Sequence, residues 1–170
     1  MPESWGKRSS ISQSGETADT LAALRLAKKK GARILSVTNV VGSTVSREAD
    51  RVMYTWAGPE IAVASTKAYT TQLMSMYLIA LSLGKRLGRI PREDYGRIVD
   101  ALVQVPDQIN QILNDKPAIQ RYANQQFNAQ SIFFMGRGLD YALALEGSLK
   151  LKEISYIHSE AYPAGELKHG

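Results

Sequence analysis

Apolar residues in the first part of the chain change from a helical to an extended pattern. Leucines and alanines recur at three-residue steps from Ala18 to Lys30, which predicts an amphipathic helix that ends at Gly31. The β-branched run Arg33–Thr38 and the shorter run Val52–Thr55 then predict two strands. Helices that alternate with strands favour a parallel sheet covered by helices, so we expect an α/β fold.

Helical patterns dominate the middle of the chain. A small helix is expected over residues 43–48, and a long one from Lys67 to about Gly84. Pro91 marks the start of another long amphipathic segment, and a shorter helix is predicted over residues 118–128. These helices are expected to connect two α/β units.

A second α/β unit is predicted from residue 131 onward. The apolar run Ser131–Met135 predicts a buried strand, followed by a glycine-rich turn and a helix over residues 141–158. The turn lacks the third glycine of a dinucleotide-binding fingerprint, so no nucleotide cofactor is expected. Residues 159–170 are polar and contain glycine and proline, which indicates a loop.

Hydroxyl side chains gather just before the first helix, in Ser12-Gln13-Ser14-Gly15-Glu16-Thr17. A loop at a helix N-terminus offers free N–H groups and the positive end of the helix dipole, which suits an anion such as phosphate. On composition alone, the same residues favour a plain helix cap, in which Ser14 or Thr17 accepts from the first turn, over a phosphate site. Residues 1–10 are polar and do not have the pattern of a buried strand that would lead into a phosphate loop.

Three charges share one face of the last predicted helix. Glu146, Lys150 and Glu153 are spaced by four and three residues, which predicts either a solvated ion-pair ladder or a carboxylate tuned for proton transfer. A second face of this helix carries residues spaced by four, four and three, namely Leu143, Gly147, Leu151 and Ile154. Gly147 is expected to let this face pack closely on a strand. His169 lies in a polar segment, where a histidine is often available for function.

Composition narrows the functional classes. The net charge is +5, but the basic residues are scattered and not interleaved with aromatic ones, which argues against nucleic-acid binding. The chain has no cysteine and only two histidines, so a thiolate site or a zinc cluster is not expected. No apolar run approaches 18 residues, so we expect a cytoplasmic protein with no membrane partner.

Four segments together resemble one known family. Residues 12–21 resemble the phosphate loop of sugar isomerase (SIS) domains, and residues 57–68, 145–158 and 160–170 resemble the isomerase half of the glucosamine-6-phosphate synthase (glutamine:fructose-6-phosphate aminotransferase) family. The resemblance implies a three-layer fold in which a parallel sheet is flanked by helices. It also implies a sugar-phosphate ligand, no cofactor and a homodimer.

The resemblance assigns roles to nine residues. The phosphate of fructose-6-phosphate or glucosamine-6-phosphate would be held by Ser12, Gln13, Ser14 and Thr17. Val63 and Ser65 would lie beside the sugar. Glu153 would shuttle a proton between C1 and C2, with Lys150 in the same site, and His169 would open the sugar ring from the partner subunit.

The family pattern also predicts how the chain is divided. Residues 11–88 would form the later part of a first SIS domain, residues 89–128 a helical connector, and residues 129–170 the beginning of a second SIS domain. Residues 1–10 do not match the pattern, and the family's cysteine-dependent glutaminase domain has no counterpart here. We therefore expect an internal fragment with two incomplete SIS domains that is inactive alone. The alternative is a non-catalytic module that only binds a sugar phosphate.

Overall fold

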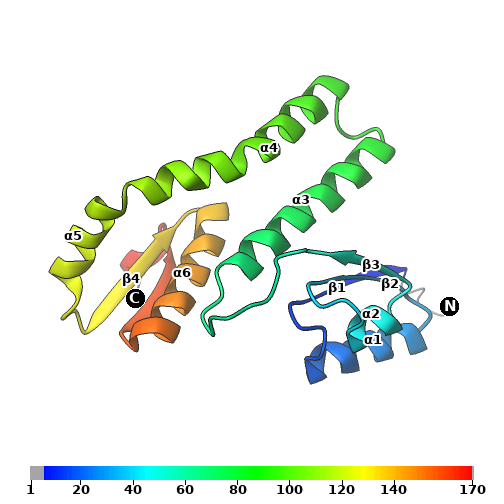
Figure 1. Cartoon of the computed structure of the whole chain (residues 1–170), viewed down its shortest axis with the longest axis horizontal. Coiled ribbons are helices and arrows are strands. Elements are labelled where there is room, and N and C mark those ends of the chain that lie inside the picture. Colours follow the sequence, from blue (N-terminus) through cyan, green and yellow to red (C-terminus); the bar gives the residue numbers. More distant parts are fainter. Residues whose placement is uncertain (1–5, 170) are drawn as a thin grey trace. The chain divides into compact units, whose positions relative to one another are not determined.

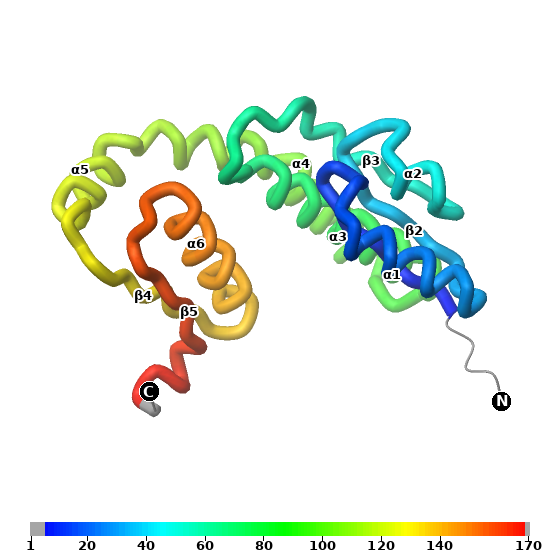
Figure 2. The backbone as a smooth tube through the Cα atoms, turned by 90° about the horizontal axis from the view of Figure 1, so that it is seen from below, coloured from blue at the N-terminus to red at the C-terminus, as the bar shows by residue number. Residues whose placement is uncertain are grey.

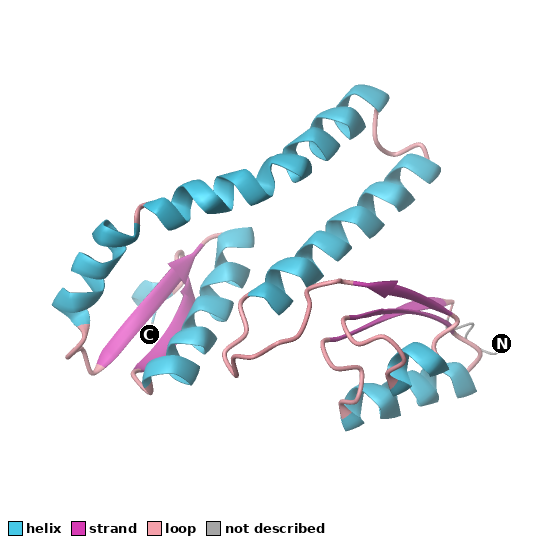
Figure 3. Cartoon of the chain, viewed as in Figure 1, coloured by secondary structure: helices cyan, strands magenta, loops and turns pink. Residues whose placement is uncertain are grey.

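A computed structural model describes residues 6–169 of the chain, with the backbone alone given for His169. The chain divides into two units, Met1–Leu102 and Val103–Gly170, and the boundary falls inside a helix. Each unit contains its own parallel strands with helices beside them (Figure 3). The expected α/β class is confirmed in both units.

Three parallel strands form the sheet of the first unit, β1 (Lys7–Ser12), β2 (Arg33–Thr38) and β3 (Arg51–Tyr54), in the order β1-β2-β3 (Figure 1). Ser12 is paired with Thr38, and Thr38 with Tyr54, so the carboxyl ends of all three strands meet at one edge of the sheet. The loops that follow these strands therefore start side by side, as is usual for ligand sites in open α/β sheets.

Two helices pack against this sheet, α1 (Ala18–Lys29) and α2 (Thr44–Glu48). The apolar stripe of α1 supplies half of the buried core, and Ala32, Ile34 of β2 and Val45 of α2 complete it. The core consists of Leu21, Leu24, Ala27, Ala32, Ile34 and Val45. Burying this stripe fixes α1 on the sheet and so fixes the loop that precedes it.

Long helices follow the first sheet: α3 (Lys67–Arg86), α4 (Arg92–Asn114) and α5 (Lys116–Gln126). The turn between α3 and α4 is close-packed, since a Cβ on Gly84 would lie 2.4 Å from Cδ1 of Ile90. Lys85 also lies 4.4 Å from the centre of the Tyr95 ring. All three helices were predicted from the sequence.

The second unit contains β4 (Ser131–Gly136), α6 (Leu139–Ser155), β5 (His158–Pro163) and a short 3₁₀ turn (Leu167–His169). Strands β4 and β5 are parallel, and α6 lies beside them (Figure 2). A Cβ on Gly147 would lie 3.0 Å from Cε1 of Phe134 in β4, which confirms the close approach expected there. Ser148 of α6 and Ser159 of β5 are both buried, and their hydroxyls are 3.0 Å apart.

Two strands were not predicted. Residues 7–12 form β1 although they were taken as irregular, and residues 158–163 form β5 although they were taken as a helix end and a loop. Both strands are polar, and both are held by backbone pairing with one neighbour, which needs no apolar alternation. Residues 1–5 lie outside the described residues.

The packing face of α6 also differs from the expected one. Leu143 and Ile154 were expected to pack on a strand, but they are 58% and 66% exposed. The residues buried against the strands are the smaller Ala144 and Ser148. Small residues allow α6 to approach the two strands closely, which leaves its larger apolar side chains outside the contact.

Candidate functional site

The segment of residues 12–17, called here the hydroxyl loop, connects β1 to α1 and depends on its glycine. Gly15 has φ +71, a left-handed conformation that side-chain-bearing residues rarely adopt. A Cβ at this position would lie 2.2 Å from Oγ of Ser43 and 3.0 Å from Oγ1 of Thr38. The loop backbone therefore lies directly against the end of β2 and the start of α2, where only glycine fits.

Hydrogen bonds from main-chain N–H groups of its neighbours fasten the hydroxyl loop. The Gln13 carbonyl accepts from the Asn39 N–H at 3.1 Å, and the Gly15 carbonyl accepts from the Val45 N–H at 3.0 Å. The Glu16 carboxylate accepts from the Thr44 N–H at 2.7 Å, and this hydrogen bond lowers the pKa of Glu16. These bonds reach across 26 to 30 positions in the sequence and hold the loop in one conformation.

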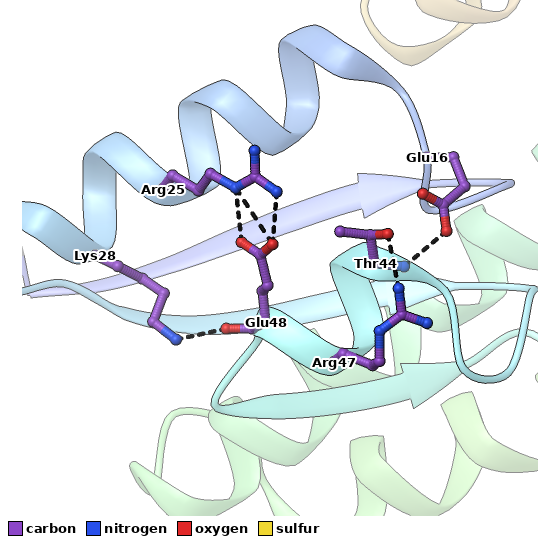
Figure 4. A network of polar contacts seen from close by, with 6 residues as sticks. All are labelled: Glu16, Arg25, Lys28, Thr44, Arg47 and Glu48. Carbon is purple, nitrogen blue, oxygen red and sulfur yellow. Dashed lines mark hydrogen bonds and ion pairs between the residues drawn. The ribbon is translucent and has the colours of Figure 1, made fainter.

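Helix α2, which holds the loop, is itself fixed to α1 (Figure 4). Arg25 of α1 contacts Glu48 of α2 through two guanidinium nitrogens, at 2.6 Å and 2.9 Å, while Lys28 donates to the Glu48 carbonyl at 2.5 Å. The same contact raises the pKa of Arg25 and lowers the pKa of Glu48. Arg47 donates to the Thr44 hydroxyl at 3.0 Å.

The hydroxyl loop does not act as a plain helix cap. Thr17 is the N-cap residue of α1, but its side chain makes no capping hydrogen bond. Ser14 accepts from the Glu16 N–H at 3.2 Å, outside the helix, and Ser12 accepts from the Gly15 N–H at 3.0 Å. Within residues 6–169, no side chain accepts from the first N–H groups of α1, so they are available to an anion.

Gln13 adds an unusual feature to this loop. Both its amide oxygen and its amide nitrogen are buried, and neither has a hydrogen-bond partner in the described part of the chain. A buried polar group without a partner costs about 1–3 kcal/mol. This cost would be removed if the side chain turned toward a ligand with donors and acceptors of its own.

The connection from β3 to α3, residues 55–66, is called here the β3 loop, and it contains the two residues expected beside a sugar. The Val63 side chain is 98% exposed, and no residue of its own unit covers it. The Ser65 hydroxyl donates to Glu60 and accepts from the Ala68 N–H at 3.1 Å. The bond from Ser65 also lowers the pKa of Glu60. Ser65 therefore orders the loop and accepts from the first turn of α3.

The charged trio of Glu146, Lys150 and Glu153 lies on α6 in the second unit. Nζ of Lys150 is 2.6 Å from Oε2 of Glu153 and 3.7 Å from Oε1 of Glu146. The three side chains are 20% to 31% exposed, which is low for surface charges. The hydrogen bond to Glu153 raises the pKa of Lys150, so the lysine is a cation at neutral pH. The predicted proximity is confirmed, and solvent reaches the carboxylates.

His169 was expected in a loop, and it ends the 3₁₀ turn Leu167–His169. Its side chain lies outside the described residues.

Sequence reasoning overlooked Asn39, which contacts both the hydroxyl loop and the β3 loop. Asn39 follows a strand and precedes a turn, and such asparagines are common, so nothing local distinguishes it.

Two kinds of feature are absent from residues 6–169. No helix there is long and apolar enough to cross a membrane. No three acidic or histidine side chains in that range gather closely enough to hold a metal ion.

The segments that carry this geometry match a known domain family in sequence. The sequence model of the SIS domain matches residues 10–82 and 127–170, which together are more than half of the chain. The chain belongs to the SIS domain family. The matched ranges contain the hydroxyl loop, the β3 loop and the charged trio of this SIS chain.

Curated SIS relatives are strongly similar in sequence. A glutamine–fructose-6-phosphate aminotransferase (isomerizing) of Caldanaerobacter subterraneus subsp. tengcongensis is 63% identical over 160 residues, which make up 94% of this chain and 26% of the relative. A protein of the same name from Methanosarcina acetivorans is 53% identical over 160 residues, again 94% of this chain and 26% of the relative. The chain thus spans about a quarter of the length of the curated relatives it matches.

Solved structures support the SIS fold. The C-terminal domain of glucosamine-fructose-6-phosphate aminotransferase from Francisella tularensis matches with a TM-score of 0.94 and 43% identity, over 96% of this chain and 47% of that one. Glucosamine-6-phosphate deaminase from Thermotoga maritima matches with a TM-score of 0.74 and 23% identity, over 99% of this chain and 49% of that one, which shows the fold alone.

Proposed function

We propose that the hydroxyl loop of the first unit binds the phosphate of fructose-6-phosphate or glucosamine-6-phosphate. The observation that carries the proposal is the set of N–H groups at the start of α1 that no side chain within residues 6–169 caps, at the end of a loop whose conformation is fixed from outside. The Gln13 amide, which has no partner in that range, belongs to the same loop. A phosphate would accept from the N–H groups and from the hydroxyls of Ser12, Ser14 and Thr17. Binding the phosphate anchors the sugar away from its reacting carbons.

For the second unit, we propose that Glu153 is the base that moves a proton between C1 and C2 of the open-chain sugar. A 1,2-proton shift needs one carboxylate that removes a proton from one carbon and returns it to the next. The Lys150 ammonium at 2.6 Å is a fixed cation that neutralises charge beside this carboxylate. The partial exposure of Glu153 leaves it accessible to a ligand.

The reaction proposed for an enzyme that contains this segment is that of the aminotransferase relatives. Fructose-6-phosphate and glutamine would give glucosamine-6-phosphate and glutamate, and this segment would supply sugar-phosphate binding and the isomerisation.

We propose in addition that two copies associate and that His169 of the partner subunit opens the sugar ring. Sedimentation at increasing concentration tests the association, and a chain that stays monomeric contradicts it.

Calorimetric titration of the chain with glucosamine-6-phosphate tests the binding proposal. Thr17→Val removes the loop hydroxyl that lies 3.4 Å from the Ser12 hydroxyl and should weaken binding about tenfold. Thr70→Val should have no effect, because Thr70 bonds only within the start of α3. Equal affinities of the unaltered chain and both variants for glucosamine-6-phosphate would contradict a phosphate site at the loop.

Glu153→Gln tests the proton-transfer proposal in the full-length enzyme. Isomerisation should fall by about a hundredfold or more while glucosamine-6-phosphate still binds, because the amide keeps the shape of the carboxylate but cannot accept a proton. Unchanged turnover would remove Glu153 from the mechanism. Binding of glucosamine-6-phosphate without isomerisation in the unaltered full-length protein would favour the alternative, a module that binds a sugar phosphate without transforming it.

A further inference from the structure

Asn39 follows β2 directly and joins the two loops of the first unit. Its main-chain N–H donates to the Gln13 carbonyl in the hydroxyl loop at 3.1 Å. Its side chain turns to the β3 loop, where Nδ2 donates to the Gly58 carbonyl at 2.8 Å. Oδ1 accepts from the Ala57 N–H at 2.8 Å and from the Thr55 hydroxyl at 3.1 Å. One residue therefore contacts both loops at the carboxyl edge of the sheet.

The three side-chain bonds surround a strained residue. Trp56 has φ +53, one of two non-glycine residues with positive φ within residues 6–169. The residues on both sides of Trp56 bond to the same oxygen of Asn39, which holds the backbone in this conformation. Strain of this kind persists only where surrounding contacts impose it, and it is common at ligand sites.

The orientation of the Asn39 amide follows from its neighbours. The Ala57 N–H can only donate, so the amide oxygen must face it, and the amide nitrogen then faces the Gly58 carbonyl. All three contacts are consistent with one orientation. No other side chain in residues 6–169 is bonded to both Ala57 and Gly58.

We propose that Asn39 is a positioning residue that sets the place of the β3 loop relative to the hydroxyl loop, and so decides whether a bound sugar phosphate meets Val63 and Ser65. This inference rests on the proposed function. Asn39 itself touches no ligand. Its main chain helps to hold the phosphate side of the site, and its side chain holds the sugar side.

The division between main chain and side chain gives a selective test. Asn39→Ala keeps the N–H that bonds to Gln13 but loses every bond to residues 55–58. Titrations with inorganic phosphate and with glucosamine-6-phosphate, followed by amide chemical shifts, should then differ. We expect the Kd for glucosamine-6-phosphate to rise at least tenfold and the Kd for inorganic phosphate to change less than twofold.

Thr55→Val provides a milder variant that should fold normally, because it removes one of the three side-chain bonds. The Kd for glucosamine-6-phosphate should rise about twofold to threefold, with no change for phosphate, and Thr70→Val in α3 should alter neither. In unliganded Asn39→Ala, exchange of the Ala57 amide hydrogen should accelerate while that of Val45 stays slow.

Two results would overturn the inference about Asn39 without overturning the proposed function. One is an equal loss of affinity for both ligands in Asn39→Ala, which would indicate damage to the whole unit. The other is unchanged affinity for the sugar phosphate in both Asn39→Ala and Thr55→Val. Failure of the unaltered chain to bind either ligand is a different outcome, because it would overturn the proposed function as well.

Discussion

The hydroxyl loop and the charged trio of α6 are built in opposite ways. The loop is shaped by contacts from distant segments, since Asn39, Ser43 and Thr44 all lie against it. The trio is entirely local, because one helix brings its three charges together. A site of the first kind depends on the whole unit folding correctly, whereas a site of the second kind needs little more than the helix.

This difference has a functional meaning. Phosphate binding by N–H groups requires a fixed backbone, which the long-range bonds and the Gly15 contact supply. Proton transfer requires a carboxylate that can move toward the substrate, and a short ion pair on a partly exposed helix face allows this. Substitutions should therefore damage the loop far more than the trio.

The largest expected effect is that of Gly15→Ala. The new Cβ would collide with Ser43 in a left-handed backbone, so the free energy of unfolding of the first unit should fall by about 3 kcal/mol. Binding of glucosamine-6-phosphate should be lost as well. Urea denaturation and calorimetric titration measure the two effects.

Gly31→Ala is the matched control for this substitution. Gly31 also has positive φ, at +81, but a Cβ there would meet nothing within 4 Å. Gly31→Ala should lower the free energy of unfolding by only about 1 kcal/mol, which is the strain of the left-handed conformation, and should leave binding intact. If the two variants were equally stable, the close approach of the loop to α2 would not exist.

A much smaller effect is expected for Lys150→Met. Removing the ammonium breaks both ion pairs of the trio. Because ion pairs that solvent reaches contribute little, the free energy of unfolding of the second unit should fall by about 0.5 kcal/mol. Thermal unfolding at low and high salt measures it, and the difference between the proteins should shrink in high salt. A loss of several kcal/mol would mean that the trio holds the second unit together.

The smallest effect concerns Glu16 and pH. Its pKa in the folded chain is lowered below the ordinary 4.5, so its bond to Thr44 stabilises the loop above that pH and is lost as the pH falls through the folded value. Amide shifts of Thr44 should report a midpoint below 4.5. Glu16→Gln can still accept from the Thr44 N–H, so this midpoint should disappear. A midpoint at or above 4.5 would contradict the bond.

Local patterns predicted much of the fold. The β-branched run Arg33–Thr38 gave a strand with the expected bounds, and the periodic leucines gave α1 to within one residue. Polar strands escaped prediction, because β1 and β5 are held by main-chain pairing that leaves no apolar signature. Ser159 is fully buried in β5, where an apolar residue would have been expected.

The candidate site was predicted unevenly for the same reason. Spacing alone placed Lys150 between Glu146 and Glu153, since helical geometry is local. The hydroxyl loop was recognised by its composition, but its fixation by Asn39 and Thr44 depends on strand order, which composition does not encode. The roles of the nine site residues rest on family resemblance and remain proposals.

A titration of the isotopically labelled chain with glucosamine-6-phosphate tests the central claim most directly. The account predicts saturable amide shifts at residues 12–20, including the side-chain amide of Gln13, and smaller shifts at residues 55–66. The same titration with glucosamine, which lacks the phosphate, should leave residues 12–20 unchanged. Absence of any shift at residues 12–20 with the sugar phosphate would contradict a phosphate site at the hydroxyl loop.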